Sequence, residues 1–269
     1  NANYNKRSVC LDLKSEDGRD VLIDLIGSAD VFVTNSRPQA MMRLGLSYDT
    51  VQAIKPDIIY AALLGFGEGG RYSGKPAYDD LIQGAVGLPF LQAKAGDGVP
   101  RYFPNAIADR AFGLAAANAV MAALVHRART GEGQQIDIPM FESVAHFVLG
   151  DHLGGMSFDP PLDEGGYHRL TSKARRPFRT KDGYICLLLY SDVQWRRFLD
   201  ITDRPPVLSG DNRFTSFAGR QEHFEDLCHA VGTVIKTRAS EDWLTLLETA
   251  DIPAMPMHSL ETLLADPHL

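Results

Sequence analysis

The sequence is poor in cysteine, with only Cys10, Cys186 and Cys228 spread over 269 residues. An odd number of widely separated cysteines does not form a disulfide framework, and their spacing is not that of a zinc site. We therefore expect a reducing, cytoplasmic setting for this protein.

An excess of positive charge is also lacking, because 27 Lys and Arg face 34 Asp and Glu, for a net charge of −7. Such a chain has no general attraction for nucleic acid or anionic membranes, and an anionic ligand would need a locally basic pocket. The longest apolar run, residues 111–125, is shorter than the roughly 20 residues of a membrane span, and no signal peptide opens the chain. We expect neither nucleic acid nor a membrane as a partner.

Common catalytic and metal-binding motifs are missing as well. The sequence contains no G-x-S-x-G, P-loop or H-E-x-x-H, and its eight histidines have no ligand spacing. Residues 65–70, GFGEGG, match G-x-G-x-x-G, but Gly74 and Pro76 follow where the dinucleotide-binding helix should begin. These glycines instead suit a tight backbone turn or a close approach to a ligand.

What is present is a soluble composition, 45% hydrophobic and 23% charged, in which strand-like and helix-like segments alternate. This alternation predicts an α/β fold with a doubly wound parallel sheet. We expect strands over 7–15, 30–35, 57–66 and 134–140, and helices over 16–30, 38–46, 48–56 and 110–129. Ligands bind at the carboxyl ends of such strands, which places Asn35, Ser36, Arg37, Gly65 and Phe66 on the functional edge.

The second half of the chain predicts a separate, smaller domain. Residues 151–166 are rich in Gly, Pro, Asp and Ser, as linkers are. We expect a large domain over 1–150, a linker over 151–172 and a small α+β domain over 173–258. The small domain should contain a strand at 182–190 and helices at 192–201, 221–238 and 240–251, the last with Ser240 as its N-cap.

Two charged features have alternative interpretations. Asp109 stands in front of the long apolar helix, and the structural interpretation is that it caps this helix. The catalytic interpretation is that the positive end of the helix keeps a nucleophilic carboxylate ionised. Five cations, Lys173, Arg175, Arg176, Arg179 and Lys181, lie within nine residues. They form either a solvated loop or a clamp for a phosphate or carboxylate.

Several motifs together resemble the class III CoA-transferases. They are NKRS at 5–8 with the LDLK that follows, TNSRPQAMMRLGL, GFGEGGRYSGKPAYDDLIQG, ADRAFGLAAANAVMAALVHRARTGEGQQIDIPM and DIPAMPMHSLETLLADPHL. The resemblance implies a Rossmann-like large domain, a small domain and an interlocked homodimer. It also implies a further first strand and, beginning at 259–269, a return to the large domain, so we expect pieces missing at both ends.

The resemblance assigns roles to individual residues. Asp109 corresponds to the catalytic nucleophile, which would exchange CoA between an acyl-CoA and a carboxylic acid through a mixed anhydride and an aspartyl-CoA thioester. CoA is then a substrate, and no tightly bound cofactor or metal is implied. The positions matching CoA contacts are Leu11, Asn35, Arg37, Ala40, Arg43 and Met140, and those matching the acyl pocket are Gly65, Phe66, Tyr78 and Asp79.

Two other functions fit the same fold. In α-methylacyl-CoA racemases a histidine acts as a base where Tyr78 stands here, and a phenol with a reference pKa of about 10 is a poor base at neutral pH. A non-catalytic CoA-binding subunit would not require Asp109. The Arg-rich segment replaces a glycine-rich loop of some relatives, which suggests an acid with an additional anionic group.

Overall fold

The computed structural model describes residues 3–269, which form two compact units. The large unit comprises the chain up to Phe90 together with Pro100–Gly165. The small unit comprises Leu91–Val99 and Gly166–Leu269. Each unit has its own sheet and its own hydrophobic core.

The large unit contains a three-stranded parallel sheet in the order β1-β2-β3. These strands are β1 (Val31–Thr34), β2 (Ile59–Leu64) and β3 (Gln134–Pro139). Central strand β2 pairs with both neighbours, so that Ile59 lies opposite Val31 on one side and Gln134 on the other. The predicted α/β class with a parallel sheet is confirmed.

Helices cover both faces of this sheet because successive side chains of β2 point to opposite sides. Tyr60, Ala62 and Leu64 belong to a core shared with α1 (Glu16–Ser28), α2 (Pro38–Arg43) and α3 (Tyr48–Ile54). Ala61 and Leu63 belong to a second core with α6 (Ile107–Thr130). An apolar strand buried on both faces is typical of parallel sheets.

The strand predicted at 7–15 is wrong. Residues 6–12 have no regular structure, and no strand within the described chain pairs with them. Alternating side chains do not suffice for a strand, because its backbone groups need a neighbour for hydrogen bonding. Helix α1 follows at once, with Ser15 Oγ accepting from the backbone N–H of Gly18 at 3.1 Å.

The long helix begins at Ile107, three residues before the predicted start, with Ala106 as its N-cap. Asp109 is therefore in the first turn, and the prediction that it caps the helix is wrong. The helix ends at Thr130, where Gly131 adopts a left-handed φ of 81° and donates its N–H to Arg127.

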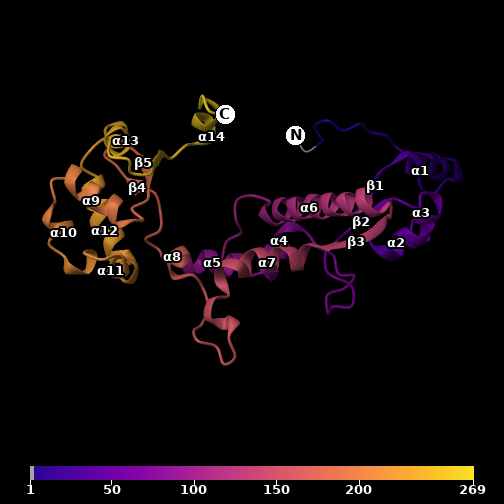
Figure 1. The fold of residues 1–269 in the computed structure, drawn as a ribbon, viewed down its shortest axis with the longest axis horizontal. Coiled ribbons are helices and arrows are strands. Elements are labelled where there is room, and N and C mark those ends of the chain that lie inside the picture. The colour runs from indigo at the N-terminus through magenta and orange to yellow at the C-terminus, as the bar shows by residue number, and fades with distance from the viewer. Residues whose placement is uncertain (1–2) are drawn as a thin grey trace. The chain divides into compact units, whose positions relative to one another are not determined.

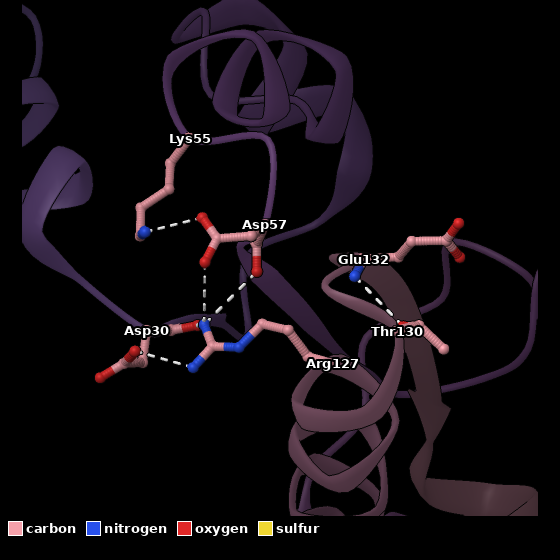
Figure 2. Close-up of polar contacts among 6 residues, drawn as sticks. All are labelled: Asp30, Lys55, Asp57, Arg127, Thr130 and Glu132. Atoms are coloured by element: carbon pink, nitrogen blue, oxygen red, sulfur yellow. Dashed lines mark hydrogen bonds and ion pairs between the residues drawn. The ribbon is translucent and has the colours of Figure 1, made fainter.

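The C-terminal end of α6 is fixed to the beginnings of two strands by one arginine (Figure 2). The guanidinium of Arg127 contacts the carboxylate of Asp30 at 2.8 Å and that of Asp57 at 3.7 Å, and it donates to both backbone carbonyls. Asp30 directly precedes β1, and Asp57 lies two residues before β2. Because α6 runs along the sheet (Figure 1), its opposite end, with Asp109, lies toward the carboxyl ends of the strands.

Further helices of the large unit follow strands β2 and β3. They are α4 (Asp79–Ala85), α5 (Leu88–Ala95, which continues into the small unit) and α7 (Met140–His152). Helix α6 is long and apolar enough to pass a length-and-composition test for a membrane span, and 17% of its most apolar window is buried. One such helix is weak evidence for a membrane.

The segment predicted as a linker contains short ordered turns, η1 (Gly154–Ser157) and α8 (His168–Thr171). Asp163 organises it, because one carboxylate oxygen accepts from the backbone N–H of Gly155 at 3.0 Å and of Gly165 at 2.7 Å. Both glycines are buried, and Gly165 has a left-handed φ of 67°.

The small unit is α+β, with an antiparallel sheet in the order β4-β5-β6. Its strands are β4 (Phe178–Arg179), β5 (Tyr184–Leu187) and β6 (Ala254–Pro256). Its helices after α8 are α9 (Asp192–Ile201), α10 (Pro206–Ser209), η2 (Asn212–Phe214), α11 (Phe217–Glu222), α12 (Phe224–Ile235), α13 (Ser240–Thr249) and α14 (Leu260–Leu264). Trp195, Phe198 and Trp243 lie at the centre of its core.

Ser240 is the first residue of α13, so the prediction that it caps this helix is wrong. Asp182, which precedes β5, provides the cap in its place. Its carboxylate accepts from the backbone N–H of Ser240 at 2.8 Å and from the Ser240 hydroxyl at 2.9 Å. These hydrogen bonds lower the pKa of Asp182 below its reference value of 3.8.

Candidate active site

A small cleft lies at the carboxyl ends of β1 and β2. Its walls include Asn35, Ser36 and Arg37, which follow β1, and Gly65 and Phe66, which follow β2. Lys75 from the loop after β2 adds a second cation. Parallel topology predicts these five edge residues as neighbours, and they line this one cleft.

The glycine-rich loop after β2 is packed onto the start of α7. The backbone N–H of Gly67 donates to Glu142 Oε1 at 3.0 Å, and the N–H of Phe141 donates to the carbonyl of Gly65 at 3.1 Å. A side chain at Gly67 would bring its Cβ within 2.8 Å of Glu142 Oε1. The glycines therefore permit close packing of this loop. The next helix begins only at Asp79, so the glycines do not lead into the helix that a dinucleotide-binding fold requires.

Asp109 is bound by a second aspartate. Its backbone N–H donates to Asp79 Oδ2 at 2.9 Å. The carboxylate of Asp79 thus accepts a hydrogen bond from one of the N–H groups at the start of α6 that have no partner within the helix. Gln83, one turn further along α4, is fully buried and donates to Asp79 Oδ1 at 2.5 Å. The Gln83 oxygen accepts from the N–H of Phe103 at 2.9 Å, which ties the loop before α6 to α4.

The pKa of the Asp109 carboxyl is raised above its reference value of 3.8, firstly by partial burial and secondly by the negative charge of Asp79. Arg110 opposes this shift without reversing it. Burial and the like charge of Asp79 thus act against the ionised form, which is the opposite direction to the effect expected of a helix terminus. An ionised Asp109 is consequently a stronger base and a better nucleophile than an ordinary aspartate.

Close packing connects Asp79 with the cleft. Gly65 lies so near Ala77 that a Cβ on Gly65 would collide with the Ala77 methyl group. Ala77 is two residues before Asp79, so the end of β2 fixes the segment whose carboxylate holds Asp109. Tyr78, between them, is the N-cap residue of α4 and is 72% exposed.

The remaining predicted contacts are more scattered. Ala40 and Arg43 lie on α2, outside the residues that line the cleft, and Leu11 is half-buried in the irregular segment before α1. Met140 was expected in a strand, but β3 ends at Pro139, and Met140 is the buried first residue of α7. Gln83 was not predicted, because nothing local distinguishes a buried glutamine from an exposed one. Residues 3–269 contain no group of three His, Cys, Asp or Glu side chains arranged to hold a metal.

The family model described as "CoA-transferase family III" matches residues 1–269. The chain belongs to this family.

Curated relatives agree with the assignment. The chain is 30% identical to an acyl-CoA transferase of Fusarium pseudograminearum, over 98% of this chain and 58% of the relative. It is 30% identical to the succinate–glutarate CoA-transferase of Agrobacterium fabrum, over 99% of this chain and 66% of the relative. The chain thus spans about three fifths to two thirds of the length of these family members.

Solved structures are similar over nearly the whole chain. A CAIB/BAIF family protein from Brucella suis superposes with a TM-score of 0.80 at 28% identity, over 99% of this chain and 70% of that one. A hypothetical protein from Mycobacterium tuberculosis gives a TM-score of 0.81 at 26% identity, over 99% and 71%.

Proposed function

We propose that this family member transfers coenzyme A from an acyl-CoA donor to a carboxylic acid, with Asp109 as the nucleophile. The observation that carries the proposal is the pairing of Asp109 with Asp79 at the carboxyl edge of the sheet. A partly buried carboxylate of raised pKa, held at a helix start, is suited to covalent catalysis. The names of the relatives, which include succinate–glutarate and succinyl-CoA:mesaconate CoA-transferases, support the same chemistry.

The proposed reaction consists of acyl exchanges in which each bond broken is matched by one formed. An Asp109 oxygen attacks the thioester carbonyl, the C–S bond breaks, and CoA leaves as a thiolate beside a mixed anhydride. The thiolate then attacks the aspartyl carbonyl, which expels the donor carboxylate and leaves an aspartyl-CoA thioester. The acceptor carboxylate attacks this thioester, and the same steps in reverse release the new acyl-CoA and Asp109. No net proton or electron is exchanged, so the route uses no tightly bound cofactor.

CoA itself is proposed to bind along the carboxyl edge of β1 and β2. Arg37 lines the cleft with a guanidinium that can bind a phosphate in a bidentate manner, and Arg43 is exposed on the same helix–loop segment. Asn35, Ala40, Leu11 and Met140 complete the proposed CoA contacts. Gly65, Phe66, Tyr78 and Asp79 are the proposed surroundings of the acyl group. Helices on both faces of the sheet support a Rossmann-like description of the large unit.

A second copy of the chain is proposed to cover α6. Leu114, Met121 and Val125 recur on one face of this helix and are 75%, 59% and 49% exposed. Phe147 on α7, which packs against α6, is 62% exposed. Exposed apolar surface of this kind marks an interaction site, and the interlocked homodimer implied by the family is the partner we propose. The free thiols fit a cytoplasmic location.

Hydroxylamine trapping tests the mechanism. The protein is incubated with an acyl-CoA and hydroxylamine, and the Asp109 peptide is examined by mass spectrometry for the hydroxamate. We expect modification of Asp109, and a loss of transfer of roughly 10³-fold or more in Asp109→Ala. Unmodified Asp109 together with full transfer by the variant would exclude the mechanism. Deuterium exchange at the α-carbon without CoA transfer would indicate a racemase, and CoA binding without either reaction would indicate a non-catalytic subunit.

A further inference from the structure

The small unit contains a pocket of about 510 Å³ between its sheet and α12. This volume lies within the range of roughly 300–1,000 Å³ that is usual for small-molecule sites. The buried side chains of Ala174, Leu227 and Val231 contribute to its lining, and Leu187 and Phe178 are half-buried beside them. The interior is therefore mainly apolar.

Three arginines line the same pocket. They are Arg169, Arg175 and Arg176, the last two exposed. Between residues 3 and 269, no carboxylate lies at ion-pair distance from any of these guanidinium groups. Glu225, an acidic group near the pocket residue Cys228, accepts a hydrogen bond from Ser172 Oγ at 2.9 Å. The positive charge at this pocket thus exceeds the negative charge.

We propose that this pocket binds a carboxylate that carries an apolar chain. The guanidinium groups bind the carboxylate, for which their planar N–H donors are suited, and the chain enters between β5, β6 and α12. A short dianion would leave the apolar interior empty, whereas an uncharged chain would leave the arginines without a partner. The site lies wholly within the small unit and does not depend on the chemistry proposed for Asp109.

The cysteines of the chain allow ligand binding at this pocket to be measured. Cys186 lines the pocket and is exposed, so a bound ligand should shield it from a thiol reagent. Cys10 is exposed on the large unit and serves as the internal control. Cys228 also lines the pocket, but burial raises its pKa to about 11, so its thiol stays protonated and reacts slowly.

The experiment measures iodoacetamide alkylation of each cysteine in the full chain by peptide mass spectrometry, with decanoate as the probe. At a decanoate concentration about ten times Kd, alkylation of Cys186 should slow by about tenfold while that of Cys10 is unchanged. Decanol, acetate and succinate should protect much less at equal concentration. An absence of protection by decanoate, or equal protection by decanol, acetate or succinate, would overturn the proposal.

The double variant Arg175→Gln and Arg176→Gln should raise the decanoate concentration that half-protects Cys186 by about tenfold or more, because two charge-assisted contacts are lost. Arg196→Gln, an exposed arginine on α9 outside the pocket, is the matched control and should bind as the wild type does. Unchanged protection in the double variant would also overturn the proposal. Asp109→Ala should retain full protection, so failure of the transferase mechanism and failure of this site are separate outcomes.

Discussion

The carboxylate of Asp79 holds the backbone of Asp109 through one oxygen and the amide of Gln83 through the other, at 2.9 and 2.5 Å. One aspartate thus fixes the position of the proposed nucleophile and, through its negative charge, raises the pKa of that nucleophile. The same contact therefore affects both geometry and ionisation.

Asp79→Asn should separate these two effects. An amide oxygen can still accept from the N–H of Asp109, but the like charge that raises the pKa of Asp109 is gone, so that pKa should fall. Because the ionised carboxylate is the nucleophile, the acidic limb of the pH–rate profile should move to lower pH. The profile of kcat for CoA transfer measures this shift. Asp80→Asn, a neighbouring exposed carboxylate, is the control, and a shift to higher pH in Asp79→Asn would contradict the prediction.

Arg127→Met should weaken the large unit by removing the contacts that join α6 to the strands (Figure 2). The arginine side chain is 18% exposed, forms ion pairs with two carboxylates and donates to two backbone carbonyls. The loss should be roughly 1–2 kcal/mol of unfolding free energy, since both carboxylates are partly solvated. Urea unfolding followed by circular dichroism measures it. Arg129→Met removes a cation from the same helix end, and an equal loss there would attribute the effect to helix charge alone.

Asp182→Asn should make the stability of the small unit less dependent on pH. The folded-state pKa of Asp182 is lowered, so its contribution to stability is present above the reference pKa of 3.8 and is lost as the pH falls through the folded value. Near neutral pH the variant should melt below the wild type, and the difference should disappear at low pH. The only two tryptophans, Trp195 and Trp243, lie in this unit, so their fluorescence reports its melting.

Asp242→Asn, in the first turn of α13, is the control for that experiment, since it removes a carboxylate near the helix start without removing the cap. A melting difference between Asp182→Asn and the wild type that stays constant across the pH range would show that the Asp182 carboxylate does not stabilise through its charge.

Local patterns predicted the elements whose determinants are themselves local. Helix α9 has the predicted bounds, Asp192–Ile201, because Ser191 and Gln194 form a capping box within four residues. The apolar run of β2 likewise predicted a buried central strand. The pattern that identifies each of these elements lies within the element or directly beside it, as the capping residues of α9 and the apolar residues of β2 itself.

The predictions that failed concern contacts between residues far apart in the sequence. The N–H groups at the starts of α6 and α13 are served by Asp79 and Asp182, 30 and 58 residues earlier in the chain. A local pattern therefore assigned the caps to Asp109 and Ser240, which are polar residues close to each start. Gln83 was missed for a related reason, since only the folded chain buries it and brings it to the N–H of Phe103, 20 residues later. The edge residues Asn35, Arg37, Gly65 and Phe66 were predictable because parallel topology alone gathers strand ends.

Leu114→Glu combined with Met121→Glu should convert the proposed dimer into a monomer. Both side chains are more than half exposed on one face of α6, and two carboxylates placed there would be desolvated without partners in a subunit interface. Sedimentation velocity should show a wild-type dimer and a monomeric variant with unchanged Trp195 and Trp243 fluorescence. Val21→Glu, an exposed apolar position on α1, should remain dimeric. A wild-type monomer, or a double variant that remains dimeric, would show that the exposed face of α6 is not the contact between copies.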